Sequence, residues 1–337
     1  MKKILIYDIA AEKTGAATVL RKYYDLYSKN EQVISYFVTS VMDFSENAHT
    51  KIIKLPWTKK SHFHRLYCDN VFVKKLIKEL DIDEVINLQN VALRGLKIPQ
   101  TVYLHNAIPI TDIDFDIKQE KSLWLFKHVI SKLIVNNLKY ADYVIVQAEW
   151  IKNELNYRTG VEKSKIIVEH YTPLIQGENT RIESDNVIFF YPASLSSYKN
   201  HSCIIKACQL LKDSNISDYE VIFTLSFEDG KAQKKLYDQV LELDLPIRFV
   251  GLLNQEEMSL MYRKSILVFP SYLETVGLPL IEAQYFDAQI IAADLPYAKE
   301  ALGGYTRVEW FDWKRPDQLA ELMQDAVIKI SEDEKNL

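Results

Sequence analysis

Two glutamates with seven residues between them have the clearest capacity for chemistry. Glu274 and Glu282 stand in the segment YLETVGLPLIEA, with Gly277 and Pro279 between them. Pro279 suits the first turn of a helix, where its missing N–H is not needed, and Gly277 lets the backbone approach a ligand closely. We therefore expect Glu274 in a loop and Glu282 just inside a helix.

Such a loop could bind a nucleotide. Its free N–H groups could hold a diphosphate, and a carboxylate beyond them could accept hydrogen bonds from sugar or ribose hydroxyls. The N–H groups concerned are those of Val276, Gly277 and Leu278. On spacing alone, two solvated glutamates at a junction of strand, turn and helix remain the simpler interpretation.

The elements that must position these residues alternate along the chain. Apolar, β-branched runs predict strands over residues 3–9, 32–38, 84–90, 101–106, 143–147, 165–170, 187–193, 220–227, 247–251, 266–271 and 289–294. Strands separated by helical patterns predict mostly parallel, doubly wound sheets. Residues directly after each strand should then meet at the carboxyl edge, where ligands bind.

One stretch interrupts this alternation. Residues 172–186 show no apolar period and mix Pro, Gly, Asn, Ser and charges, which is typical of a linker. We predict an N-terminal domain over 1–175, a linker over 176–186 and a C-terminal domain over 187–337. A chain of 337 residues can bury two cores of ordinary size.

Composition excludes several classes of protein. The chain has nine glycines and neither GxGxxG nor GxxxxGK[ST], which disfavours a dinucleotide dehydrogenase and a P-loop NTPase. Its three cysteines are too few and too unevenly placed for a disulfide framework or a CxxC metal site. Without a membrane-spanning run or a signal-peptide pattern, the protein is expected to be cytoplasmic.

The segment FPSYLETVGLPLIEA resembles the E-x7-E signature of the retaining family-4 glycosyltransferases. The similarity extends through FVGLLNQEEMSLMYRKSILVFPS and IIAADLPYAKEALGG and reaches YPASLSSYKNH. It implies an α/β protein of GT-B fold, with two Rossmann-like domains facing a central cleft. The second domain would bind the donor and the first the acceptor, as in enzymes of bacterial surface-polysaccharide synthesis.

The same resemblance implies roles for individual residues. Glu274 would lie at the donor sugar, Glu282 would bind the ribose hydroxyls, and Lys199 would neutralise the departing diphosphate. His105 ends a predicted strand where the family has a histidine near the donor sugar, and Ser194 stands where an arginine is common. The substrate-binding set would be completed by Thr14, Gly15, Ser194, Asn200, Leu252, Thr275, Val276, Gly277 and Leu278.

The implied reaction moves a sugar from a UDP- or GDP-sugar to a hydroxyl of a glycan or lipid-linked acceptor, with retention and without a metal or other cofactor. No nucleic-acid partner is expected. Two alternatives stay open on the same fold. A sugar-nucleotide epimerase would need no acceptor, and a catalytically silent nucleotide-sugar binding subunit is favoured by Ser194 and by a loop in which only Gly15 remains.

A metal site in the segment TDIDFD is disfavoured. Asp112, Asp114 and Asp116 mimic the start of a calcium loop, but its sixth position is Ile117 where Gly is needed, and its twelfth is Leu123 where Glu is needed. A DxD metal motif belongs to a different glycosyltransferase fold. We expect a capped, solvated loop.

The charges divide unevenly. Residues 1–180 hold 25 Lys and Arg against 21 Asp and Glu, a balance of +4, whereas residues 181–337 hold 16 against 25, a balance of −9.

A predicted helix over 121–140 has a buried stripe of Leu123, Phe126, Val129, Ile130, Leu133 and Ile134, and opposite it Lys121, His128, Lys132 and Lys139. With the basic residues of 57–67 and 73–80, this face could meet anionic lipid as a peripheral membrane contact. An ordinary solvated helix face is the alternative.

Overall fold

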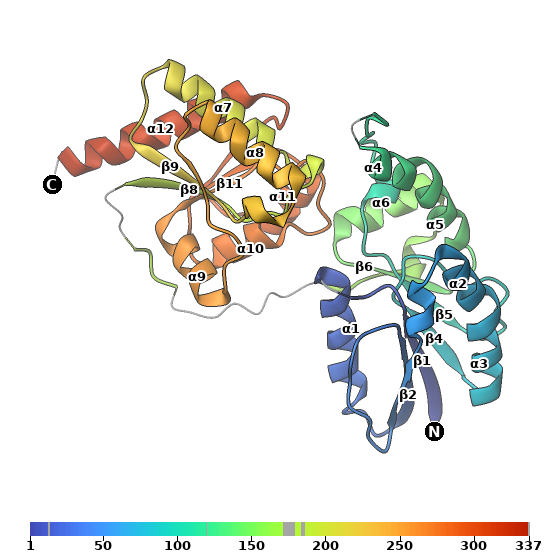
Figure 1. Ribbon diagram of the computed structural model, residues 1–337. Coiled ribbons are helices and arrows are strands. Elements are labelled where there is room, and N and C mark those ends of the chain that lie inside the picture. Colours follow the sequence, from blue (N-terminus) through green and yellow to red (C-terminus); the bar gives the residue numbers. More distant parts are fainter. Residues whose placement is uncertain (13, 119, 171–178, 183–185, 336–337) are drawn as a thin grey trace. The chain divides into compact units, whose positions relative to one another are not determined.

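The computed structural model describes residues 1–12, 14–118, 120–170, 179–182 and 186–335. The chain divides into two compact units, Met1–His170 and Tyr171–Leu337 (Figure 1). Each unit contains one sheet whose paired strands run parallel, which confirms the predicted α/β class.

The N-terminal sheet has the order β3-β2-β1-β4-β5-β6-β7. Its strands are β1 Lys2–Asp8, β2 Val33–Thr39, β3 Thr50–Lys54, β4 Glu84–Asn87, β5 Gln100–Tyr103, β6 Tyr143–Val146 and β7 Ile166–Val168. Its helices are α1 Thr14–Tyr27, α2 His62–Tyr67, α3 Val73–Leu80, α4 Lys121–Leu125, α5 Ser131–Leu138 and α6 Glu149–Thr159. Shorter turns of helix are η1 Pro56–Lys59, η2 Cys68–Phe72, η3 Ile108–Ile110, η4 Phe126–Ile130 and η5 Lys163–Lys165.

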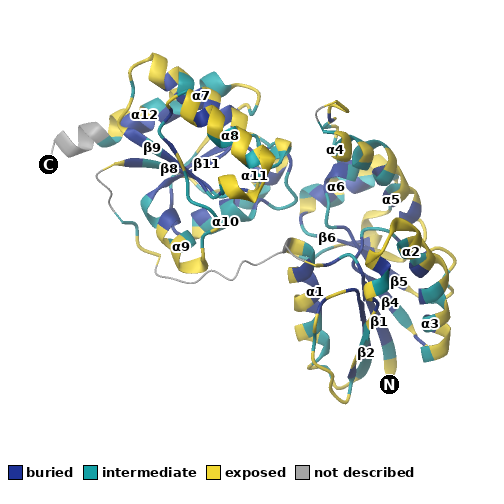
Figure 2. Cartoon of the chain, viewed as in Figure 1, coloured by how far each residue is buried: buried dark blue, intermediate teal, exposed yellow. Residues whose placement is uncertain are grey.

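β1 shows why this sheet is buried on both faces. Ile4 and Ile6 belong to a core that includes side chains of α1, whereas Leu5 and Tyr7 belong to a second core that includes side chains of α3. Successive side chains of a strand point to opposite faces, so a strand with a continuous apolar run needs helices on both. Figure 2 shows the strands as the darkest, most buried parts of each unit.

The C-terminal sheet has the order β10-β9-β8-β11-β12-β13. Its strands are β8 Val187–Tyr191, β9 Tyr219–Phe223, β10 Ile247–Phe249, β11 Ile266–Phe269, β12 Ile290–Ala293 and β13 Val308–Phe311. Its helices are α7 His201–Asp213, α8 Lys231–Glu242, α9 Gln255–Lys264, α10 Leu278–Tyr285, α11 Pro296–Leu302 and α12 Pro316–Lys335, with short turns η6 Ser197–Lys199 and η7 Phe227–Asp229.

Both sheets contain a point at which the chain reverses its direction of travel. From β1 the chain adds β2 and β3 on one side and then returns to place β4 on the other. From β8 it adds β9 and β10 and then returns to place β11. Ligands of open parallel sheets bind at such points, beyond the carboxyl ends of the two central strands.

The predicted linker lies partly outside the described residues. Of 176–186, the structure describes 179–182 and Asn186. The backbone of Ile182 donates to Arg263, and Arg181 Nη1 donates to the carbonyls of Tyr262 and Ser265 at 2.7 and 3.1 Å. Residues 181 and 182 therefore pack at the end of α9 and belong structurally to the C-terminal unit.

The buried stripe predicted for 121–140 is partly wrong. The segment is α4, the π-helical turn η4 and α5, and Val129 and Leu133 are 51 and 41 % exposed. A π-helical turn closes its hydrogen bonds one residue later than an α-helix does, so the residues within and beyond it rotate away from the predicted face. Ile134 and Leu138 are the buried apolar residues of α5.

No helix in the described part of the chain is both long enough and apolar enough to cross a membrane.

Candidate active site

Lys199 and Glu274 meet where the C-terminal sheet reverses direction. Lys199 ends η6, which follows β8, and Glu274 lies in the loop that follows β11. Lys199 Nζ is 2.5 Å from Glu274 Oε1, and the two side chains are 18 and 13 % exposed. A partly buried ammonium and carboxylate thus stand at the edge of the sheet where a ligand is expected.

Buried hydroxyl groups fix the loops that carry this ion pair. Tyr191 Oη lies 2.5 Å from the Lys199 carbonyl, to which it donates, and 2.8 Å from Ser271 Oγ. Tyr297 donates to the Ser271 carbonyl at 2.5 Å. Burial raises the pKa of the Tyr191 and Tyr297 hydroxyls well above the usual value for tyrosine, so both remain neutral hydrogen-bond donors.

The side chain of Asn200 also holds the loop that carries Lys199. Its backbone is left-handed, with φ 59°, and its Nδ2 donates to the carbonyls of Pro270 and Trp313 at 3.2 and 3.0 Å. This amide nitrogen therefore positions the Lys199 loop against the loops that follow β11 and β13.

Ser194 and His201 do not add a positive charge beside Lys199. Ser194 is an exposed neutral residue three positions beyond β8. His201 is buried against Tyr191 and Phe223, with ring centroids 4.9 and 5.0 Å away. Burial, together with the nearby Lys199 ammonium, lowers the pKa of His201 to about 3, so the ring is neutral near pH 7.

Gly277 starts α10 in a conformation that only glycine adopts easily. Its φ is 77°, and a Cβ built on it would lie 3.1 Å from Leu280 Cδ1 and 3.2 Å from the Tyr297 ring. Pro279 occupies the first turn of α10, as predicted. Thr275, Val276 and Leu278 are half-buried around this helix start.

Glu282 lies inside α10, as predicted, and is held by a buried phenol. Tyr262 of α9 donates to Glu282 Oε2 at 2.7 Å. Burial raises the pKa of Glu282, and the hydrogen bond from Tyr262 opposes that rise. The carboxylate keeps capacity to accept further hydrogen bonds, since each carboxylate has about four acceptor positions.

Leu252 follows β10 and is almost fully exposed, at 96 %. A large apolar side chain in that state is available to a ligand.

The N-terminal residues predicted for the site stand at the carboxyl edge of their own sheet. Thr14 begins α1, and a Cβ built on Gly15 would meet no atom within 4 Å. His105 follows β5, stacks on Tyr103 at 4.4 Å and donates from Nε2 to the Leu88 carbonyl at 2.9 Å. Burial lowers the pKa of His105 to about 4, so this imidazole is a neutral hydrogen-bonding group.

Sequence reasoning missed the tyrosines that hold the site. Tyr191 is the last residue of β8, Tyr262 lies in α9 and Tyr297 in α11, and all three look like ordinary core residues in the sequence. Their partners lie 8 to 80 residues away in the chain. Only a tyrosine at the end of a buried strand, as at Tyr191, offers a weak sequence signal.

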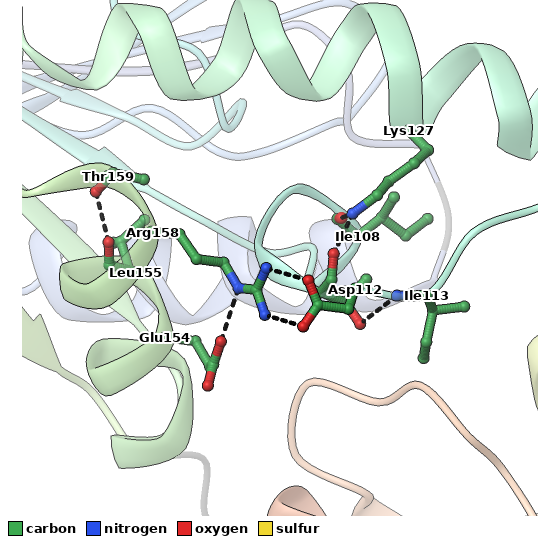
Figure 3. Close-up of polar contacts among 9 residues, drawn as sticks. Ile108, Asp112, Ile113, Lys127, Glu154, Leu155, Arg158 and Thr159 are labelled. Carbon is green, nitrogen blue, oxygen red and sulfur yellow. Dashed lines mark hydrogen bonds and ion pairs between the residues drawn. The ribbon is translucent and has the colours of Figure 1, made fainter.

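The acidic segment TDIDFD is engaged within the protein. Arg158 of α6 donates to both oxygens of Asp112, at 2.6 and 2.7 Å, and to Glu154 at 2.7 Å (Figure 3). Asp114 accepts from His128 at 2.8 Å, and Asp116 accepts from the Lys118 N–H. Among the described residues, no group of three or more His, Cys, Asp or Glu is arranged to hold a metal ion.

The crowding at Gly277 leads to a stability prediction. Gly277→Ala should destabilise the protein by about 2–4 kcal/mol, because the left-handed backbone and the close contacts both oppose a Cβ. Gly304→Ala is the matched control, since its φ is 87° but no atom lies within 4 Å of the added Cβ. We expect about 1 kcal/mol there. Urea unfolding of both variants measures the difference, and equal losses would contradict the packing argument.

The buried His201 leads to a pH prediction. Its pKa is about 3 in the folded protein and about 6.5 in an unfolded chain, so between these values only the unfolded chain binds the proton. The free energy of unfolding therefore falls as the pH drops below 6.5. His201→Phe keeps a ring in place but cannot bind this proton. When the pH is lowered from 7.5 to 5.5, the free energy of unfolding of this variant should therefore fall by about 1 kcal/mol less than that of the native protein. Urea unfolding at both pH values tests this; identical losses would refute it.

The chain is similar in sequence to known glycosyltransferases. The Glycosyl transferases group 1 family matches residues 175–336. The O-antigen chain mannosyltransferase RfbU of Salmonella typhimurium strain LT2 is 24 % identical over 237 residues, which cover 69 % of this chain and 64 % of that protein. The chain thus spans less than two thirds of that relative.

Two solved structures share the fold over nearly the whole chain. Sucrose-phosphate synthase from Thermosynechococcus elongatus superposes with a TM-score of 0.71 and 16 % identity, covering 98 % of this chain and 91 % of that one. HepE from Anabaena, solved in complex with UDP-glucose, gives 0.65 and 14 %, covering 97 % and 90 %. Residues 175–336 are therefore similar to the group 1 glycosyltransferases, and the chain has the two-domain GT-B fold.

Proposed function

We propose that the protein transfers a sugar from a nucleotide-sugar donor, a UDP- or GDP-sugar, to a hydroxyl of a glycan or lipid-linked acceptor, with retention of the anomeric configuration. The observation that carries the proposal is the Lys199–Glu274 pair at the point where the C-terminal sheet reverses direction. It combines a cation suited to a diphosphate with a carboxylate suited to sugar hydroxyls.

The donor would be held by the C-terminal unit. Lys199 and the N–H groups at the start of α10 would bind the diphosphate, and Glu282, positioned by Tyr262, would accept from the ribose hydroxyls. Glu274 would accept from hydroxyls of the donor sugar. The complex of the structurally similar HepE with UDP-glucose supports a nucleotide-sugar donor.

The chemistry would occur on one face of the donor sugar. The bond from the anomeric carbon to the diphosphate oxygen breaks, and the acceptor oxygen bonds to that carbon from the same side. The departing diphosphate takes the acceptor's proton. Lys199 stabilises the growing negative charge as a fixed cation, a role that elsewhere falls to a metal ion. The neutral His105 would contribute a hydrogen bond rather than a charge.

The acceptor would be bound by the N-terminal unit and belong to cell-surface polysaccharide synthesis. The curated relative RfbU is an O-antigen chain mannosyltransferase, which supports this class of pathway. Lipid-linked glycans are assembled at membranes, so we infer a cytoplasmic protein with a peripheral membrane contact.

Helices α4 and α5, with the η4 turn between them, would form that contact. Leu125, Val129 and Leu133 are exposed at intervals of four residues. Exposed lysines accompany them at Lys121, Lys132 and Lys139. Apolar side chains flanked by cations are typical of helices that lie in the interface of an anionic membrane.

Substitution of the ion pair tests the reaction. Lys199→Ala and Glu274→Gln should each lower the transfer rate by about a hundredfold or more, because each removes a group that acts at the developing charge. UDP, GDP and their sugars are first screened by thermal shift, since a ligand of the native state raises the melting temperature. Transfer from the stabilising donor to lipid-extract acceptors is then measured.

Lys206→Ala, on the exposed side of α7, is the matched control and should remain active. Full activity of either site variant would refute the assignment. A modified free sugar released without an acceptor would indicate an epimerase instead.

Liposome sedimentation tests the membrane contact. At low salt the native protein should sediment with vesicles of anionic phosphatidylglycerol but not with neutral phosphatidylcholine. Replacing Lys121, Lys132 and Lys139 together by Gln should abolish binding. The matched control replaces Lys231, Lys234 and Lys235 of α8, which removes the same charge from the C-terminal unit. Equal binding by both triple variants would contradict the proposed surface.

A further inference from the structure

The N-terminal sheet has its own reversal point, between β1 and β4, and polar side chains converge there. Asp8 is the last residue of β1, and Gln89 lies two residues beyond β4. Arg65 of α2 reaches the same place, because its Nη2 donates to Gln89 Oε1 at 3.2 Å. This is the counterpart of the position that Lys199 and Glu274 occupy in the C-terminal sheet.

Asp8 is buried but incompletely bonded. Its Oδ1 accepts the N–H groups of Ala10 and Ala11, both at 2.9 Å, whereas its Oδ2 is buried without a hydrogen-bond partner in the described structure. Ser40 Oγ, which follows the residue paired with Asp8 across β2, is in the same state. Buried polar atoms are nearly always bonded, so unmet ones suggest a bound molecule.

The guanidinium of Arg65 is also incompletely hydrogen-bonded. A guanidinium carries five N–H donors, and in the described part of the chain that of Arg65 makes one hydrogen bond, to a neutral amide, and no ion pair. The nearby Lys59 is engaged with Glu12 at 2.5 Å and with the Ala10 carbonyl. Burial raises the pKa of Asp8 to about 6, so near pH 7.5 its carboxylate is ionised close to Arg65 without bonding it.

We propose that Arg65 and Gln89 form a binding site for an anionic, hydroxyl-bearing ligand at the carboxyl edge of β1 and β4. A phosphate or carboxylate would engage the planar guanidinium through two parallel hydrogen bonds, and a neighbouring hydroxyl would meet the Gln89 amide. The inference rests on the proposed function, in which this unit binds the acceptor. It adds that the acceptor carries an anionic group beside one of its hydroxyls.

A purely structural role for Arg65 fits the contacts less well. An arginine that only holds helix α2 in place would normally pair with a carboxylate, and both Asp8 and Asp69 lie close enough for the charge of Arg65 to lower their pKa values. Asp69 instead accepts from Tyr7 at 2.5 Å. The guanidinium is therefore oriented by Gln89 and keeps its remaining donors.

Trp57 provides a spectroscopic probe of anion binding next to the proposed site. Trp57 of η1 lies 6.2 Å from His64 and 6.1 Å from Tyr67 of α2, measured between ring centroids. In protein labelled with 5-fluorotryptophan, the Trp57 fluorine signal, assigned with Trp57→Phe, should shift on titration with inorganic sulfate. Lys199→Ala should leave this titration unchanged, which separates it from sulfate binding in the C-terminal unit.

Variants of Arg65 and of Asp8 should change the affinity for sulfate in opposite directions. Arg65→Gln should weaken sulfate binding about ten- to hundredfold, and Arg65→Lys less, because lysine keeps the charge but loses the fork. Arg21→Gln, an exposed arginine of α1, is the charge-matched control and should have no effect. Asp8→Asn should tighten binding about three- to tenfold, since it removes a negative charge beside the anion. Unchanged binding in Arg65→Gln and Arg65→Lys would overturn the proposal.

Two further probes separate the sources of the anion. Dioctanoyl phosphatidic acid represents a lipid phosphate and glucose 6-phosphate a soluble sugar phosphate. Binding of either that depends on Arg65 supports the site and identifies the source.

The inference and the proposed function can fail separately. Arg65-dependent sulfate binding in a protein that transfers no sugar would support this site and refute the proposed function. Transfer to an anionic acceptor with a KM unchanged in Arg65→Gln would support the function and overturn the inference.

Discussion

The parallel order of both sheets is the constraint on which the sites depend. Because all strands of a sheet run one way, every loop that leads from a strand to a helix emerges at the same edge. Where the chain reverses direction, the loops after two adjacent strands diverge to opposite faces and leave the backbone between them accessible. Lys199 and Glu274 stand at the β8/β11 reversal, and Asp8 and Gln89 at the β1/β4 reversal.

Neutral phenols then set the positions of the charged groups. Tyr191 fixes the Lys199 loop, Tyr297 fixes the start of the Glu274 loop, and Tyr262 holds Glu282. Burial raises the pKa of all three, so each donates a hydrogen bond without adding a charge. A charged positioning residue would change the field at Lys199 and Glu274, whereas a buried phenol orients them and leaves their ion pair intact.

The sequence predicted the fold better than the details of the site. Strands with continuous apolar runs were located correctly, but β3, with its sequence TKIIK, and β13, with its sequence VEWF, were missed because charged residues interrupt their apolar runs. The spacing around Gly277 and Pro279 predicted the start of α10, since both residues act locally. The Lys199–Glu274 contact joins residues 75 apart, and the Arg65–Gln89 contact depends on the path of α2. Spacing within one element carries no information on either contact.

The two reversal points differ in how their cations are balanced, and this difference bears on how each would bind an anion. At Lys199, the diphosphate of the proposed donor would compete with Glu274, so binding would exchange one negative partner for another and keep the partly buried ammonium paired throughout. Under the proposed function, Glu274 would then be released to accept hydrogen bonds from hydroxyls of the donor sugar. The diphosphate and the sugar of one donor would thus each engage one member of the ion pair. At Arg65 no partner has to leave, and an arriving anion supplies the pairing that the protein itself does not make. Binding at Arg65 should therefore need no exchange of partners, whereas binding at Lys199 should require a ligand that offers both a phosphate and hydroxyl groups.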